Sequence, residues 1–245
     1  EGVKSAVRVL RILEFFDQIQ RDARVSEIVE RLSFPQSSTS ALLRSLVQTG
    51  YLDYSPATRT YAPTARVALL GAWAGGSPMR DGSLLRMMED LSAETGETIL
   101  LASPNGIFAQ YIYVIQATNP MRLHVLLGSQ RPLVWSATGT ALLSDMPEDA
   151  VRLLVRRTNA EAPPGQKVVD VRQTLANVER FRKQGYFFSR GMVVYGAGVI
   201  AMRLPATSTN PGRPLALGIG GLNESLEKHE RRIVGLMRDA IGRYI

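Results

Sequence analysis

The first 64 residues alternate short amphipathic segments with turn residues. After Ser5, apolar side chains recur at helical spacing, which predicts a helix that Ser5 caps. Its core-facing side consists of Ala6, Val9, Leu10, Leu13 and Phe16. A short helix capped by Ser26 follows, and a third helix is predicted from Pro35 or Gln36 to Gly50, since glycine suits the left-handed position after a helix end. The short connection between the last two helices is typical of a helix-turn-helix.

Two aromatic-rich segments follow, residues 51–54 and 59–62, separated by turn residues that include Ser55 and Pro56. This pattern predicts a β-hairpin, which directly after a helix-turn-helix forms a wing. Thr64 then starts a helix that ends at the glycine- and proline-containing stretch 75–78. We expect a winged helix-turn-helix domain over residues 1–63, a linker helix in 64–78 and a second domain over residues 79–245.

The second domain mixes helices and strands without a regular alternation. Helices are expected over 84–96, 137–144, from 147, over 170–185 and from 225. Strands are expected over 98–103, 107–115, 123–127, 186–189, 199–204 and 215–219. Asn105 and Gly106 form a hairpin turn between the first two strands, and Asp170 with Gln173 has the spacing of a capping box. The order of the elements favours an α+β fold over a doubly wound sheet.

The predicted third helix has an apolar side and a side of small polar residues with one arginine. Small side chains allow the backbone to approach a major groove, and serine, glutamine and arginine bind phosphates or base edges. The candidate DNA-binding residues are Gln36, Ser37, Ser38, Ser40, Arg44 and, beside the hairpin turn, Arg59. A polar helix face by itself is more often a solvated surface, but the wing and the preceding short helix favour double-stranded DNA as the partner.

Composition narrows the class of protein without locating its site. The 245 residues carry a net charge of +7, but residues 1–64 hold eight basic and seven acidic side chains, a net of +1. Charge alone therefore does not mark the DNA-binding segment. The chain has no cysteine, no apolar run of the roughly 18 residues that a membrane helix needs, and no recognisable secretion signal, so we expect a cytoplasmic protein.

Enzymatic alternatives find little support in the residues. The segment Gly196-Ala197-Gly198-Val199-Ile200-Ala201 matches a dinucleotide-binding fingerprint by letter, but strand-like residues and Pro205 follow it instead of a helix. His124 and His229 are the only histidines, too few for a closed zinc site unless carboxylates complete it. We expect no cofactor, no metal and no catalytic residue.

The residues also resemble a known family. The run from Val25 to Leu46, continued by Gly50-Tyr51-Leu52 and Tyr61, resembles the winged-helix domain of IclR-type transcriptional regulators. Similar signatures in the second domain are Gly128, Pro132-Leu133, residues 136–143, Arg182, Gly185-Tyr186, Gly196 and Ile200-Ala201. The resemblance implies a GAF-like effector domain, a small organic acid or aromatic effector, and homodimers, often paired into tetramers. Gln36 and Ala41 stand where the family often has lysine and arginine, so two usual DNA contacts are missing.

The resemblance places an effector cavity between residue 137 and the central sheet. Backbone N–H groups of Ala137, Thr138 and Gly139 at a helix start can hold a carboxylate, although Ser136 can equally serve only as the cap. Relatives that bind very small acids tend to have larger or more polar residues at four positions, here Ser189, Val199, Gly218 and Gly220. This difference favours an aromatic or medium-length carboxylate. Trp135 and Tyr111 are further candidates for the lining, although single aromatic residues more often belong to a core.

Two functions remain at this point. The first is a DNA-binding regulator that responds to a small organic acid, and the residues favour it. The second is a small-molecule binding protein or enzyme whose helix-turn-helix serves packing or protein contacts. A salt-dependent shift of duplex DNA separates the two, because phosphate contacts weaken as salt rises.

Overall fold

The computed structural model describes residues 3–71, 81–119, 123–166, 168–206 and 214–245. The chain divides into two compact units, Glu1–Ala74 and Gly75–Ile245. Predictions that fall on residues 72–80, including the end of the linker helix, lie outside the described residues. Each described helix is too short or too polar to cross a bilayer.

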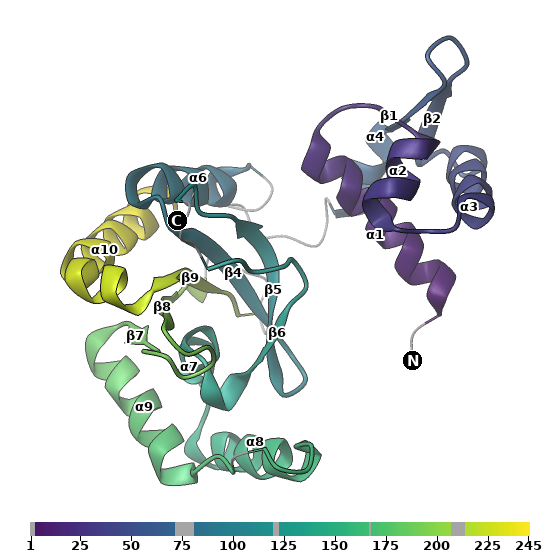
Figure 1. Cartoon of the computed structure of the whole chain (residues 1–245). Helices are drawn as coiled ribbons and strands as arrows, with labels where there is room; N and C mark the ends of the chain where they lie inside the picture. The colour runs from purple at the N-terminus through teal and green to yellow at the C-terminus, as the bar shows by residue number, and fades with distance from the viewer. Residues whose placement is uncertain (1–2, 72–80, 120–122, 167, 207–213) are drawn as a thin grey trace. The chain divides into compact units, whose positions relative to one another are not determined.

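The first unit is a winged helix-turn-helix (Figure 1). Its helices are α1 (Lys4–Ile19), α2 (Val25–Leu32), α3 (Gln36–Gln48) and α4 (Ala65–Gly71), and its strands are β1 (Ala23–Arg24), β2 (Leu52–Ser55) and β3 (Thr60–Pro63). The strands form an antiparallel sheet in the order β1-β3-β2. The core comprises Ile12, Phe15, Phe16, Ala23, Ile28, Leu43, Leu46 and Leu52. Gly50 has φ +75°, which is the left-handed conformation expected after the third helix.

Two predicted helix caps in this unit are wrong. Helix α1 begins at Lys4 after Val3, before the predicted cap Ser5, and Val3 offers no side-chain hydrogen bond. Helix α2 begins at Val25, so Ser26 lies inside its first turn. Arg24 pairs with Thr60 in the sheet, and the chain therefore passes from strand to helix without a separate capping residue.

The predicted buried side of α1 is also only half correct. Ala6 is exposed and Leu10 is 60% exposed, whereas Ile12, Phe15 and Phe16 are buried. Only the C-terminal half of α1 supplies fully buried side chains to the core. Helical periodicity identifies an apolar side but not the length of it that a neighbouring element covers.

The second unit is built on a six-stranded antiparallel sheet in the order β6-β5-β4-β9-β8-β7. The strands are β4 (Thr98–Asn105), β5 (Phe108–Ile115), β6 (Gln130–Pro132), β7 (Phe187–Phe188), β8 (Ala197–Arg203) and β9 (Ala216–Leu222). The helices are α6 (Ser83–Thr95), η1 (Leu133–Trp135), α7 (Ala137–Leu143), α8 (Glu148–Glu161), α9 (Val171–Gln184) and α10 (Asn223–Tyr244). Mixed helices and an antiparallel sheet make the fold α+β, as predicted.

Helices cover both faces of this sheet (Figure 1). Side chains of β4 alternate between two cores: Ile99 and Leu101 face α6 and α10, whereas Leu100 and Ala102 face α7, α8 and α9. The alternation follows the two-residue period of a strand. Strand β8 contains most of the segment around Gly198 that matches a dinucleotide-binding fingerprint by letter, so this segment does not open a helix, as the sequence indicates.

Three further predictions are corrected in this unit. Residues 123–127 are not a strand, because the side chain of Gln116 rather than another strand bonds the backbone N–H and C=O of Val125. Ser225 does not cap the last helix, which begins at Asn223; its hydroxyl instead donates to the buried carboxylate of Glu97 over 2.8 Å. Only two residues of the predicted strand 186–189 pair, as β7.

The predicted capping box at α9 is half formed. Asp170 Oδ1 accepts a hydrogen bond of 2.7 Å from the backbone N–H of Gln173. The side chain of Gln173 does not return to Asp170 but donates to Asn177 Oδ1 over 3.1 Å. A competing partner one turn further along the helix thus replaces the second bond of the box.

Candidate DNA interface and ligand cavity

One side of helix α3 packs against the core of the first unit, and the other side is exposed. Leu43 and Leu46 are buried in the core of the first unit, and the hydroxyl of the buried Thr39 donates to Pro35 O over 2.9 Å. Gln36 and Ser37, two of the predicted DNA contacts, are exposed at the start of the helix. The exposed side therefore offers polar groups on a rigid helix, which is the arrangement that a major-groove reader needs.

Ser38 and Ser40 are less accessible than the sequence predicts, because both are half-buried. Ser38 Oγ accepts a hydrogen bond from Arg8 Nη1 over 3.2 Å and donates to Pro35 O over 3.0 Å. The guanidinium of Arg8 also lies 5.3 Å from the ring centre of Phe34. Arg8 thus lies beside the start of α3, a position that no local pattern in the sequence indicates.

Arg44 and Arg59 are exposed, and neither side chain forms a hydrogen bond or ion pair among the described residues. Arg44 projects from α3, and Arg59 follows the turn of the hairpin, where its backbone N–H donates to Ser55 O over 2.8 Å. Arg59 has φ +57°, a left-handed backbone conformation that residues other than glycine rarely adopt. Two unpaired guanidinium groups are therefore available on the helix and on the wing.

A cavity of about 30 Å³ lies in the second unit between the start of α7, the sheet and the segment 189–196. Its lining includes five of the predicted effector residues: Tyr111, Ser136, Ala137, Ser189 and Val199. Ser136 and Ser189 are buried, and Val193 and Val194, which also line the cavity, are 42% and 44% exposed. The cavity therefore has a buried floor and an apolar cover that is partly exposed.

The start of α7 offers fewer free donors than predicted. Ser136 Oγ accepts a hydrogen bond of 3.1 Å from Gly139 N, so the N–H of Gly139 is not free to hold a carboxylate. Gly139 does not line the cavity. Its lack of a side chain has a different cause, since a Cβ at this position would lie 2.6 Å from the Cα of Leu133. Close approach of two backbone segments, rather than ligand binding, requires glycine here.

Gly218, Gly220, Thr138 and Trp135 also lie outside the lining of this cavity. Neighbouring side chains fill the space next to both glycines: a Cβ would meet Val199 Cγ1 at 3.1 Å from Gly218 and Leu123 Cδ2 at 3.1 Å from Gly220. The glycines thus do not leave the open volume on which the prediction of a larger ligand depended. Thr138 is fully buried.

Sequence reasoning missed seven residues of the lining, of which one is charged. They are Leu123, Val125, Arg131, Val193, Val194, Ala197 and Gly198. Arg131 is half-buried, and its Nη1 donates to Gln130 O over 3.0 Å. Burial raises the pKa of the nearby Tyr111, while the Thr138 side chain and the charge of Arg131 act in the opposite direction. The resemblance had pointed to α7 and had given no reason to consider Arg131.

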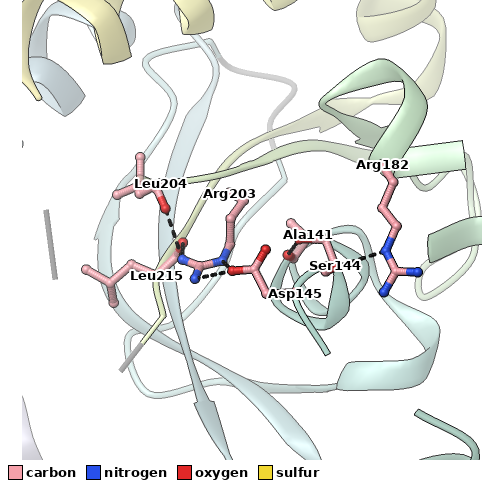
Figure 2. A network of polar contacts seen from close by, with 7 residues as sticks. All are labelled: Ala141, Ser144, Asp145, Arg182, Arg203, Leu204 and Leu215. Atoms are coloured by element: carbon pink, nitrogen blue, oxygen red, sulfur yellow. Dashed lines mark hydrogen bonds and ion pairs between the residues drawn. The ribbon is translucent and has the colours of Figure 1, made fainter. Parts of the chain in front are cut away.

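The other end of α7 is fixed by two arginines (Figure 2). Arg182 donates to Ser144 O over 2.8 Å and to Met146 O over 2.7 Å. Arg203 binds Asp145 Oδ2 over 2.6 Å from the opposite side. Cations stabilise the negative end of a helix, so these contacts hold α7, and with it the floor of the cavity, in one position.

Comparisons with known proteins agree with this arrangement. The model of the IclR helix-turn-helix domain matches residues 5–56, and the model of the bacterial transcriptional regulator IclR C-terminal domain matches residues 82–242. The chain is 26% identical to the acetate operon repressor of Salmonella typhimurium over 192 residues, 76% of this chain and 69% of that protein. It is 27% identical to the HTH-type transcriptional repressor AllR of Salmonella typhi over 213 residues, 82% of this chain and 74% of that protein.

Solved structures of IclR proteins resemble this chain as well. The effector domain of IclR from Acinetobacter sp. ADP1 has a TM-score of 0.62 and 30% identity, over 67% of this chain and 94% of that chain. The Thermotoga maritima IclR shares the fold over 99% of both chains, with a TM-score of 0.59 at 17% identity. The chain therefore belongs to the IclR family of bacterial transcriptional regulators.

Proposed function

We propose that this regulator binds operator DNA through α3 and the wing, and that a small organic carboxylate in the cavity of the second unit modulates this binding. Family membership supports DNA binding as such, since the curated relatives are transcription regulators rather than enzymes. The carboxylate rests on one observation: Arg131 is the only charged residue in the described lining of the cavity.

The exposed side of α3 supports direct reading of the major groove. Gln36, Ser37 and Arg44 are exposed on it, and Arg44 has no intramolecular partner among the described residues. An arginine that binds guanine through both of its terminal nitrogens contributes about 1 to 3 kcal/mol of discrimination. Arg59 on the wing supplies a charge suited to a phosphate or a minor groove.

We expect Arg44→Ala to weaken specific operator binding by about 1 to 3 kcal/mol and to relax specificity at one base position. Ser37→Ala should weaken binding less. A gel-shift or fluorescence-anisotropy titration at several salt concentrations measures both. Arg157→Ala, which removes the same charge from α8 in the second unit, is the matched control. Operator affinity that stays unchanged in both α3 variants would exclude this helix from the groove.

The polarity of the cavity supports an anionic ligand. Arg131 supplies a positive charge, and the described lining of the cavity contains no acidic side chain to neutralise that charge. The hydroxyl of Tyr111 adds a hydrogen-bond donor, whereas the hydroxyl proton of Ser136 is already donated to Pro132 O over 2.9 Å. A carboxylate satisfies a guanidinium and a hydroxyl at once, whereas a neutral ligand leaves the charge of Arg131 without a partner.

The size of the cavity supports an acid smaller than the aromatic or medium-length one that the sequence suggests. About 30 Å³ is room for roughly two water molecules by the same measure. An acid of two or three carbons displaces about that much water. Since side chains fill the space beside Gly218 and Gly220, we propose a short-chain carboxylate as the effector.

We expect Arg131→Gln to weaken binding of pyruvate or glyoxylate by about 10- to 100-fold, the range for one lost charge-assisted hydrogen bond. Isothermal titration calorimetry measures the effect, and Arg131→Lys should restore part of the affinity. Gln130→Ala, at the neighbouring exposed position, is the control. Unchanged affinity in Arg131→Gln would refute this assignment, and tighter binding of benzoate than of pyruvate would refute the proposed size.

Exposed apolar side chains on the first unit support a homodimer. On α1 and its preceding residue, Val3, Val7 and Leu10 are 71%, 49% and 60% exposed, and on α4 Leu69 and Leu70 are 68% and 51% exposed. Apolar surfaces of this kind on a small unit mark interaction sites. A dimer also presents two recognition helices, so we propose a partly palindromic operator. The predicted tetramer stays a prediction.

We expect at least a dimer at micromolar concentration, and we expect Leu10→Glu to shift the protein toward the monomer. Light scattering coupled to size-exclusion chromatography measures the mass. Because Leu10 is exposed, the substitution should leave the fold of the unit intact, which circular dichroism checks. Arg157→Glu, a charge reversal on α8, is the control. A wild-type monomer both with and without DNA would contradict the dimer.

A further inference from the structure

A second hollow of about 150 Å³ lies in the same unit and shares no lining residue with the cavity described above. It lies beside α9, next to the residues that precede α7. Its apolar lining consists of Val134, Trp135, Val168, Val169 and Met192. Neighbouring residues of the chain face different spaces, since Trp135 and Met192 line the hollow whereas Ser136 and Val193 line the first cavity. The hollow is therefore a separate space of its own.

The two spaces differ in size and in charge. The hollow, at about 150 Å³, has room for a benzene-sized ring, which the first cavity, at about 30 Å³, does not. Asp170 lines the hollow, and its described lining contains no basic side chain. The charged side chain in the described lining is therefore acidic in the hollow and basic in the first cavity.

One side chain in the hollow has a hydrogen-bond donor that no described group of the protein uses. Asn177 is 6% exposed, and its Oδ1 accepts a hydrogen bond of 3.1 Å from Gln173 Nε2. Its Nδ2 donates to no group among the described residues and is open to solvent on the side of the hollow. A ligand with a hydrogen-bond acceptor can therefore replace water at this donor.

We propose that this hollow is a second small-molecule site, which binds a neutral planar aromatic compound carrying a carbonyl acceptor and an N–H or O–H donor. The aromatic ring occupies the apolar space between Trp135 and Met192. The carbonyl accepts from Asn177 Nδ2. The donor group binds the carboxylate of Asp170, of which only Oδ1 is engaged by Gln173 N. Benzamide has each of these features and serves as the probe.

The test uses the whole 245-residue chain with Trp73→Phe, which leaves Trp135 as its only tryptophan. Titration with benzamide should change the Trp135 fluorescence in a saturable way, and calorimetry should give the same affinity. Asn177→Leu keeps the side-chain volume and should weaken binding by about tenfold, the effect of one lost hydrogen bond. Met192→Phe, which fills the hollow from the segment 189–196, should also weaken it. Glu179→Gln, exposed on the same helix, should have no effect.

Arg131→Gln separates this site from the proposed effector cavity, because it should leave benzamide affinity unchanged. Thermal unfolding of each variant verifies that it is folded. If Asn177→Leu does not fold, Met192→Phe still tests the proposal. The proposal is overturned if benzamide produces no saturable response. It is also overturned if Arg131→Gln abolishes the binding, or if both Asn177→Leu and Met192→Phe leave it unchanged.

Discussion

Gly139→Ala is expected to destabilise the second unit by about 3 kcal/mol or more, at or above the upper end of the range for overpacking. The added Cβ would contact the backbone of Leu133, lying 2.6 Å from its Cα and closer still to its carbonyl oxygen. Backbone atoms cannot rotate away as a flexible side chain does, so α7 would have to move away from η1. Urea unfolding followed by the fluorescence of Trp135 in the Trp73→Phe background measures the loss.

Gly235→Ala is the matched control for this prediction. Gly235 lies inside α10, and a Cβ there would meet no atom within 4 Å. Alanine has the higher helix propensity, so this variant should be more stable than the wild type by roughly 0.5 to 1 kcal/mol. If Gly139→Ala unfolded at the same urea concentration as the wild type, the close packing of α7 on η1 would be incorrect.

Leu43→Ala is expected to destabilise the first unit by about 2 to 5 kcal/mol, because it opens a cavity in a small core. Leu43 is fully buried among Ile12, Phe16 and Ile28. Part of the protein should then have an unfolded first unit, and operator binding should fall with it. Hydrogen exchange of the α3 amides, followed by mass spectrometry, measures the local stability of this unit.

Arg44→Ala distinguishes a folding defect from a lost DNA contact. It changes the next residue of α3, which is exposed, and should leave hydrogen exchange in α3 unchanged while weakening operator binding. Leu43→Ala should change both. Wild-type exchange rates in Leu43→Ala would contradict the burial of α3 against the core.

The elements that the sequence predicted well are those that local chemistry decides. The helix α3 begins at Gln36 as the pattern indicates, and Gly50 follows it with a positive φ that other residues rarely adopt. Asp170 caps its helix as predicted, and Ser136 caps its helix, which was the alternative to a carboxylate site there; in each case the partner N–H lies three residues away. The interactions involved span a few residues, so the sequence contains all the information needed.

Side chains with several available partners could not be assigned in this way. Ser26 and Ser225 have the residue type of a helix cap, yet Ser26 lies in the first turn of a helix and Ser225 donates to Glu97, 128 residues earlier in the chain. Similarly, Arg8 reaches Ser38 from a different helix. A hydrogen bond between distant segments forms only when the fold brings them together, and periodicity carries no information about such pairs.

By itself, the sequence determined the winged helix-turn-helix, the α+β class of the second unit and the family. Only the tertiary structure decided what occupies the space around each candidate site residue. It placed Arg131 in the cavity through the pairing of β6 with β5, filled the space beside Gly218 with Val199, and assigned Gly139 to backbone packing. Local hydrogen bonds and helical periodicity depend on neighbours in the chain, whereas a cavity is the space that non-neighbouring side chains leave between them.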